Sequence, residues 1–379
     1  MTILYILHST EMSGATISFM NMVLGLQKNG MTPVIVVPDK GVNSDFTNIM
    51  RQNNIPCICS PIVQSIIIPL EKNHILHWLK LTIQLPLQKI RSKIRLTKII
   101  RNIKPDIIHT NTGVIHEGFH LALEYNIPHV WHLREYQTED FHYHILPSHS
   151  RFCSYLTHSY VITITDGIRH YFKLDSKPNA QTIYNGIYHE YDVRYDNEKE
   201  NYFLLSSRIA PEKGHLDVIK AFANFSRKDS YRLLIAGYGN TEYKATIMDT
   251  AKKLGCVNNI EFIGFHSDVR PLMSKAKALI VASYYEGFGR MTAEAAFCGT
   301  LVIGRNSAGT KEIMDVIGGL AFNSIEEMTA QMEKTANLTP EEYEKMALTA
   351  QKNAANHYSI ENNINRISEL YAKILQNKL

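Results

Sequence analysis

The sequence lacks the usual marks of a membrane or secreted protein. No apolar run reaches the roughly 18 residues that a membrane span needs. The first residues, MTILYILH, have neither the basic region nor the cleavage site of a signal peptide. The cysteines form no C-x-x-C pair, which argues against a zinc or redox motif. We interpret them as reduced core residues of a cytosolic protein. They are Cys57, Cys59, Cys153, Cys256 and Cys298.

Strong charge and a metal-binding motif are also missing. The net charge of +4 is too small to indicate a nucleic-acid partner. No strict Asp-x-Asp occurs, and the nearest acidic clusters, 190–192 and 196–198, lie in a polar stretch between apolar segments. We therefore predict no metal requirement. The length of 379 residues and 45% apolar content favour a soluble protein of two domains.

Short apolar runs alternate with segments rich in helix formers in two successive series. This alternation predicts α/β domains with parallel sheets. The first series starts at residues 3–7 and the second at 202–205. The polar stretch 188–201 separates them, so we predict an N-terminal domain over 1–190 and a second domain over 200–358. A closing amphipathic helix, 359–379, is expected to pack back towards the first domain.

One segment of the first half departs from this pattern. Residues 72–104 carry nine basic residues, no acid and many apolar residues, and Pro86 should break or kink the segment. One interpretation is a basic amphipathic element on an anionic membrane surface, which so many like charges favour. The other is a helix packed on the sheet with a solvated basic face.

A phosphate-binding arrangement is indicated in the second half. The apolar run 278–282 predicts a strand, Gly287 and Gly289 a loop, and 290–297 a helix. A strand, a glycine loop and a helix N-terminus present backbone N–H groups to an anion. Glu286 and Glu294 bracket this loop; taken alone, two such glutamates are more often surface acids.

Two basic residues occupy a second loop of the same half. Arg208 and Lys213 follow the strand at 202–205 and precede a helix, so they should lie at the carboxyl edge of the sheet. Two fixed cations there suit a diphosphate. Taken alone, they would more often be exposed loop cations.

Several ordered motifs resemble the retaining glycosyltransferases of family four, which have the GT-B fold. They are SRIAPEKG at 207–214, LIAGYG at 234–239, IEFIG at 260–264 and YEGFG at 285–289. Glu294 follows the glutamate of the last motif, Glu286, eight positions later. The match covers most of residues 202–315 and is looser in the first half. The resemblance implies two Rossmann-like, doubly wound domains that face each other across a cleft.

The resemblance also implies residue roles in the second domain. Arg208 and Lys213 would hold the diphosphate of the donor, Glu286 the hydroxyls of its sugar, and Glu294 the hydroxyls of its ribose. The turn at Gly264 would border the base. The β-phosphate and sugar would meet the backbone of Phe288, Gly289, Arg290 and Met291.

In the first domain the resemblance implies two further roles. Gly14 would let its backbone approach the phosphates. His132 would lie near the donor sugar, although a histidine that ends an apolar strand is more often structural. The family commonly has two glycines at the first turn, where this chain has Ser13-Gly14, and two at the later turn that contains Gly309.

The implied activity is transfer of a hexose or N-acetylhexosamine from a UDP- or GDP-sugar with retention of configuration, without a metal or other cofactor. The motif WHLRE at 131–135 is similar to one in capsule and O-antigen transferases. Its Arg134 and Glu135 would serve the acceptor or pair structurally. We expect a cytoplasmic enzyme, peripheral on the inner face of the membrane, with a lipid-linked saccharide acceptor in cell-surface polysaccharide biosynthesis.

Three rival interpretations stay open. Gly237-Tyr-Gly239 hints at a nicotinamide-dependent dehydrogenase, but the third glycine of the motif is replaced by Glu242. A sugar-nucleotide 2-epimerase would share the two-lobed fold, against which the Arg208–Lys213 spacing and the paired glutamates argue. A non-catalytic relative that binds sugar nucleotides is the third.

Overall fold

A computed structural model of the chain describes residues 1–67, 75–141 and 143–376. The chain divides into two compact units. The first consists of Met1–Gly186 and Ile360–Leu379, and the second of Ile187–Ser359. The polar stretch that we expected to separate two domains thus lies at the start of the second unit, and the chain returns to the first unit after residue 359.

The first unit is built on a parallel sheet of seven strands in the order β3-β2-β1-β5-β6-β8-β9. Its central strands are almost fully buried, because helices cover both faces. The strands are β1 (Thr2–Ile6), β2 (Thr32–Pro38), β3 (Cys57–Ser60), β5 (Ile107–Thr110), β6 (His129–Leu133), β8 (Tyr160–Thr163) and β9 (Ala180–Thr182). A separate antiparallel pair is formed by β4 (Ile66–Ile67) and β7 (His144–Ile145).

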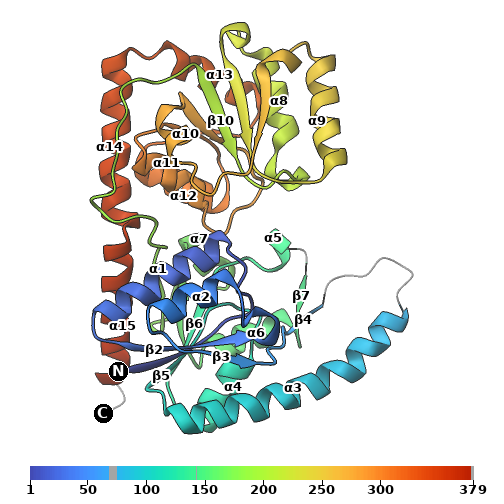
Figure 1. The fold of residues 1–379 in the computed structure, drawn as a ribbon, viewed down its shortest axis with the longest axis vertical. Helices are drawn as coiled ribbons and strands as arrows, with labels where there is room; N and C mark the ends of the chain where they lie inside the picture. Colours follow the sequence, from blue (N-terminus) through green and yellow to red (C-terminus); the bar gives the residue numbers. More distant parts are fainter. Residues whose placement is uncertain (68–74, 142, 377–379) are drawn as a thin grey trace. The chain divides into compact units, whose positions relative to one another are not determined.

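Helices α1, α2 and α15 pack on one face of this sheet, and α3 and α4 on the other. Helix α15 lies beside α1 (Figure 1), and its Ile367 and Tyr371 are buried against the sheet. The helices of the unit are α1 (Gly14–Lys28), α2 (Asp45–Gln52), α3 (Ile75–Ile103), α4 (Glu117–Glu124), α5 (Thr138–Phe141), α6 (His149–Leu156), α7 (Asp166–Tyr171) and α15 (Ile360–Gln376).

Helix α3 contains most of the basic segment, whose Lys72 lies outside the described residues. It continues through Pro86, so of the two effects predicted for this proline, a break or a kink, the break was wrong. A proline inside a helix removes one N–H and its hydrogen bond, but the segments on both sides of Pro86 are helical. The last turns of α3 pack on the sheet through Leu96, Ile99 and Ile100. In contrast, Leu87, Ile90 and Ile94 are 57%, 56% and 54% exposed.

The second unit contains a parallel sheet of six strands in the order β12-β11-β10-β13-β14-β15. Helices α8, α9 and α13 cover one face, while α11 packs on β13 and β14. The strands are β10 (Tyr202–Ser206), β11 (Arg232–Ala236), β12 (Ile260–Gly264), β13 (Ala278–Val281), β14 (Val302–Arg305) and β15 (Leu320–Phe322). The helices are α8 (His215–Asn224), α9 (Thr241–Lys253), α10 (Arg270–Lys275), α11 (Arg290–Phe297), α12 (Ala308–Ile317), α13 (Ile325–Asn337) and α14 (Pro340–Tyr358).

Each sheet has one point where the direction of winding reverses. In the first unit, β1 leads outwards to β2 and β3, while its other neighbour, β5, leads to β6. In the second unit, β10 leads to β11 and β12, while β13 leads to β14 and β15. The loops that follow two such strands diverge and leave a crevice, which is where open α/β sheets bind ligands. The prediction of two doubly wound α/β halves is confirmed.

All five cysteines are free: Cys256 and Cys298 are buried, and the other three are partly buried. Over the part of the chain that the structure describes, no helix combines the length and the apolar character needed to cross a bilayer.

Candidate functional site

The two loops predicted to bind a diphosphate meet at the reversal point of the second sheet. One follows β10 and ends in the 3-10 turn Pro211–Lys213; the other follows β13. Lys213 Nζ lies 2.6 Å from Glu286 Oε1, and their side chains are 19% and 24% exposed. Thus a cation and an acid selected from separate motifs form one ion pair across the crevice.

The backbone holds these loops at a short separation. Tyr284 N donates to Glu212 O over 3.0 Å, which joins the two loops directly. Gly214 has φ +72°, and a Cβ there would lie 2.3 Å from Ala282 O, so only glycine fits this approach. On the far side of the second loop, Gly309 N donates to Glu286 O over 3.0 Å. The position of Glu286 is therefore fixed from both flanks.

Arg208, the other predicted cation, and Arg290, predicted only for its backbone, also have carboxylate partners. Arg208 Nη2 lies 2.5 Å from Glu212 Oε1 in an exposed pair. Arg290 Nε lies 2.5 Å from Glu294 Oε1, and Glu294 is only 8% exposed. A diphosphate could attract Arg208 and Lys213 away from these acids, since its oxygens accept charge-assisted hydrogen bonds. Sequence reasoning did not identify Glu212 as the partner of Arg208, although Glu212 lies in the same motif as Arg208 and Lys213.

Helix α11 begins directly after the glycine loop. Its N-cap is Gly289, with φ +86°, and no side chain caps the first turn. Phe288 is 5% exposed and packs edge-on against Tyr358, with ring centroids 5.8 Å apart. A Cβ on Gly309 would come within 2.5 Å of Phe288 O, so this glycine keeps the loop close to α12. Met291, in the first turn of α11, is partly exposed.

Gly264 stands at the other end of the carboxyl edge, where β12 ends. It has φ +78° and open space around its Cα. The next residue, Phe265, is 67% exposed and contacts Tyr238, which is 59% exposed and follows the adjacent strand β11. Their ring centroids are 5.8 Å apart. The two rings meet edge to face at an interplanar angle of 63°, and a planar base could stack on an exposed face of one of them.

A partly buried brace supports the loop after β13, and sequence reasoning missed it. Arg305 Nη2 lies 2.7 Å from Asp217 Oδ2, and Arg305 Nε donates to Ala282 O over 3.0 Å. The Tyr284 hydroxyl donates to the same Asp217 oxygen over 2.9 Å, while the Arg305 guanidinium stacks on its ring at 4.3 Å. Asp217 and Arg305 are 88 residues apart, and no motif connects them.

In the first unit, the structure places Gly14 at the surface and His132 in the interior. Gly14 is exposed and opens helix α1, which Ser13 caps by accepting a hydrogen bond from Thr16 N. His132 is buried near the end of β6, with its ring 5.3 Å from that of His109. Burial lowers the pKa of His132 well below its usual range, and the nearby positive charge of Arg134 lowers it further.

Arg134 and Glu135 do not pair with each other. Arg134 donates to Asn111 Oδ1 over 2.9 Å and to Asn185 Oδ1 over 2.8 Å, and burial lowers its pKa to about 10. Glu135 Oε1 instead accepts from the loop after β5. The two side chains therefore have separate neighbours at the carboxyl edge of the first sheet.

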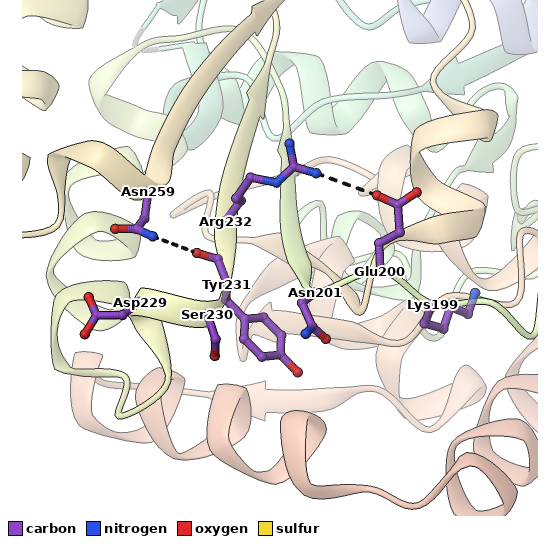
Figure 2. A pocket seen from close by; sticks show the side chains of 8 residues that line it. All are labelled: Lys199, Glu200, Asn201, Asp229, Ser230, Tyr231, Arg232 and Asn259. Carbon is purple, nitrogen blue, oxygen red and sulfur yellow. Dashed lines mark hydrogen bonds and ion pairs between the residues drawn. The ribbon is translucent and has the colours of Figure 1, made fainter.

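A hollow of the second unit lies at the opposite edge of its sheet. It has a volume of about 570 Å³ and is lined by residues just before β10, β11 and β12 (Figure 2). Arg232 and Glu200 form an ion pair there at 3.6 Å, and Asn259 Nδ2 donates to Tyr231 O over 3.3 Å. None of the predicted site residues lines this hollow.

No group of three or more histidine, cysteine, aspartate or glutamate side chains is placed to hold a metal ion within the described ranges. The residues that could hold a charged ligand are instead the cations Arg208 and Lys213. The prediction of a metal-independent reaction is not tested by this arrangement.

Two family models match the chain. The family described as Glycosyl transferases group 1 matches residues 192–357, and the one described as Glycosyltransferase Family 4 matches residues 12–191. The O-antigen chain mannosyltransferase RfbU of Salmonella typhimurium is 35% identical over 150 residues, which is 39% of this chain and 40% of that protein. The chain thus spans less than half the length of this curated relative.

A second relative is an α-1,4-N-acetyl-D-galactosaminyltransferase of Campylobacter jejuni, whose name gives a PP-undecaprenol-linked saccharide. It is 28% identical over 126 residues, covering 31% of this chain and 33% of that protein. Among solved structures, Anabaena HepE in complex with UDP has a TM-score of 0.79 at 18% identity and covers 98% of this chain and 100% of that chain. A Rickettsia africae glycosyltransferase has a TM-score of 0.78 at 20% identity, with 99% of each chain covered.

Proposed function

This chain belongs to the glycosyltransferases of group 1 and family 4 with the GT-B fold, and we propose that it uses a UDP- or GDP-sugar as donor. The sugar is a hexose or N-acetylhexosamine, and the acceptor is a hydroxyl of a lipid-linked saccharide in cell-surface polysaccharide biosynthesis. The reaction retains the anomeric configuration and needs no metal. The complex of Anabaena HepE with UDP supports the choice of a nucleotide donor.

The observation that carries this proposal is the ion pair between Lys213 and Glu286 at the reversal point of the second sheet. A sugar diphosphate combines anionic oxygens with hydroxyl groups. Lys213, with Arg208 on the same loop, can bind the oxygens, while the Glu286 carboxylate can accept hydrogen bonds from the hydroxyls. A cation and an acid 2.6 Å apart therefore match the junction between phosphate and sugar.

The other residues of the second unit extend this assignment along the donor. Glu294, in the middle of α11, would bind the ribose hydroxyls, and the backbone of 288–291 would meet the β-phosphate. The turn at Gly264 would border the base. An exposed face of Phe265 or of Tyr238, which meet edge to face, gives that base a ring to stack on.

In the reaction, the acceptor oxygen forms a bond to the anomeric carbon while the bond from that carbon to the β-phosphate oxygen breaks. The hydroxyl proton passes to the departing phosphate on the same face, and the nucleoside diphosphate leaves. Such a leaving group needs charge stabilisation and positioning, which Arg208 and Lys213 supply in place of a metal. His132 would contact the donor sugar, and Gly14 would admit the phosphates.

A lipid-linked acceptor would bring the enzyme to the inner face of the membrane. Helix α3 supports this location, because Leu87, Ile90 and Ile94 recur at helical spacing and are more than half exposed. Basic residues flank this stripe, a combination typical of helices that lie on an anionic bilayer. They are Lys89, Arg91, Lys93, Arg95 and Lys98. The names of the Salmonella and Campylobacter relatives point to the same kind of acceptor.

A transfer assay tests the proposal. Purified protein is incubated with UDP- and GDP-sugars, with undecaprenyl-diphosphate-linked sugars and octyl glycosides as acceptors, and with EDTA present. We expect one donor to give a product whose new linkage has the donor's anomeric configuration by NMR. Glu286→Gln should abolish transfer and leave the fold intact. An inverted product, a metal requirement or full activity of Glu286→Gln would contradict the mechanism.

A further inference from the structure

One tyrosine joins three segments at the carboxyl edge of the second sheet. Tyr284 stands just before Glu286 in the loop after β13. Its N–H donates to Glu212 O over 3.0 Å, in the loop after β10. Its carbonyl oxygen accepts from Ser307 Oγ over 2.9 Å, in the loop after β14. Its hydroxyl donates to Asp217 Oδ2 over 2.9 Å, in the first turn of α8. The backbone and the side chain of this tyrosine thus tie the loop of Glu286 to its neighbours.

Arg305 holds the same loop from the end of β14. Its guanidinium carbon lies 4.3 Å from the centre of the Tyr284 ring. Its Nη2 lies 2.7 Å from Asp217 Oδ2, the oxygen that also accepts from the tyrosine hydroxyl, and its Nε donates to Ala282 O over 3.0 Å. A planar guanidinium can contact an acid, a carbonyl oxygen and a ring together, which a lysine ammonium cannot. The side chains of Asp217, Tyr284 and Arg305 make up the brace.

Stability alone does not explain this set of side chains. Those of Asp217 and Arg305 are only 20% and 15% exposed. Removing two charges from water is costly, and well-packed apolar residues of similar volume are often equally or more stabilising. Tyr284 is 46% exposed, so it gains only part of the free energy of burial. Buried ion pairs are best attested as devices that specify one arrangement. The composition of the brace therefore favours a role in positioning.

The residue that the brace positions is Glu286. Its carboxylate lies 2.6 Å from Lys213 Nζ, so a shift of its loop would separate two groups that are assigned to adjoining parts of the donor. A displacement of about 1 Å in a reacting complex can lower the rate about 100-fold. We propose that Asp217, Tyr284 and Arg305 are positioning residues that hold Glu286 at the hydroxyls of the donor sugar. This inference rests on the proposed function.

The Tyr284 hydroxyl remains a donor under the conditions of the reaction. Burial raises its pKa, and the hydrogen bond to Asp217 raises that pKa further. The hydroxyl therefore keeps its proton near pH 7, and only the loss of the oxygen itself removes this contact.

Two conservative substitutions weaken the brace without removing a group assigned to the donor. Tyr284→Phe deletes one hydroxyl and keeps the ring beside the guanidinium. Arg305→Lys keeps the positive charge near Asp217 and loses the planar group that also reaches the loop backbone. The matched controls are Tyr191→Phe, at a 72% exposed tyrosine of the same unit, and Arg232→Lys, at a half-exposed arginine on the opposite edge of the sheet.

The experiment compares catalysis with two kinds of binding. We measure kcat at saturating donor, and by calorimetry the affinities for the sugar nucleotide and for its free nucleoside diphosphate. Because Glu286 is assigned to the sugar alone, we expect both brace variants to have kcat lower by about tenfold or more. Affinity for the sugar nucleotide should fall about tenfold relative to that for the free diphosphate, which should stay within about twofold of the wild type. Both controls should match the wild type.

A general structural role predicts a different pattern. The inference is overturned if both brace variants match the wild type in kcat and in affinity, or if they lose affinity for the free diphosphate as strongly as for the sugar nucleotide. Amide hydrogen exchange over residues 282–289, measured without ligand, should be faster in both brace variants than in the controls, since the contacts of this loop are weakened. Unchanged exchange would also contradict the inference.

The binding measurements keep the two proposals apart. Transfer by the wild type that neither brace variant lowers would uphold the proposed function and overturn the positioning role. If the wild type transfers no sugar, but both variants lose affinity for the sugar nucleotide and keep it for the free diphosphate, the positioning role is upheld and the proposed transfer is contradicted. Absence of sugar-nucleotide binding by the wild type would overturn both.

Discussion

Arg134 Nη2 lies 3.4 Å from His132 Nδ1, and this contact determines the tautomer of the histidine. A guanidinium nitrogen can only donate, so Nδ1 must be the acceptor and the proton must sit on Nε2. The lowered pKa of His132 keeps the ring neutral near pH 7. His132 therefore presents an N–H, rather than a charge or a lone pair, at Nε2.

This tautomer predicts an order among substitutions of His132. A glutamine amide reaches the position of Nε2, whereas an asparagine amide reaches that of Nδ1. We expect His132→Gln to retain at least about tenfold more transfer activity than His132→Asn, since only the former can replace the N–H donor. In the wild type, nitrogen-15 NMR should show the proton on Nε2. Equal activities, or a proton on Nδ1, would refute the assignment.

Lys213 neutralises the charge of Glu286, so donor affinity should depend on Lys213. Lys213→Met removes the cation and leaves the Glu286 carboxylate to repel the diphosphate. We expect donor affinity to fall about 10- to 100-fold, as for a lost charge-assisted contact. Calorimetric titration with the preferred sugar nucleotide measures it. Lys311→Met, in an exposed ion pair with Asp315, should bind like the wild type. Similar affinities in both variants would remove Lys213 from the site.

Helix α3 should bind anionic vesicles through both charge and apolar contact. Each basic residue near such a surface contributes about 1 kcal/mol. Replacing Lys89, Arg91, Lys93 and Arg95 by glutamine should abolish flotation with vesicles that contain phosphatidylserine, and replacing Leu87, Ile90 and Ile94 by serine should weaken it strongly. Replacing the three lysines of α9 by glutamine is the control. Absence of flotation for the wild type would leave α3 as a packed helix with a solvated basic face.

The first unit should lose stability in mild acid because it buries several neutral histidines. Burial lowers the pKa of His116 and of His129 to about 3, and that of His109 and His132 well below the usual range. Below about pH 6.5 the unfolded chain binds protons that the folded unit does not, so the free energy of unfolding decreases as the pH is lowered. Each buried histidine contributes up to about 1.4 kcal/mol per pH unit to this decrease.

Urea unfolding at about pH 7.5 and about pH 5.5 measures this loss, with a lower midpoint expected at the lower pH. The ring of His116 stacks on that of Phe152, so another aromatic ring suits this position. His116→Phe should therefore reduce the pH dependence of the urea midpoint. His170 has a side chain that is 86% exposed, and His170→Phe should leave the dependence unchanged. Equal midpoints at both pH values would contradict the account.

The sequence predicted the sheets and loops well because their signals are local. An apolar run such as 278–282 followed by glycines indicates a buried strand and a turn without knowledge of its neighbours. The placement of Arg208, Lys213, Glu286 and Glu294 on loops and a helix at the carboxyl edge followed from that order. The break expected at Pro86 was wrong, since helix α3 continues through this residue although a proline removes one helical hydrogen bond.

The pairings could not be predicted, because they join residues far apart in sequence. Lys213 and Glu286 are separated by 73 positions, and Asp217 and Arg305 by 88. Only the strand order, which reverses between β10 and β13, places the loops of the first pair together. Nothing in the local sequence of Gln137 indicated that its amide would be buried without a partner.

The most direct test of the donor site is thermal stabilisation by UDP-, GDP- and ADP-sugars in EDTA. A donor at 100 times its Kd should add about 2.7 kcal/mol to folding. The account predicts that a UDP- or GDP-sugar clearly raises the thermal midpoint. Arg208→Ala should abolish this rise, and Lys252→Ala, at an exposed position of α9, should preserve it. No shift with any sugar nucleotide, or an equal shift in Arg208→Ala, would contradict the assignment of the diphosphate to these loops.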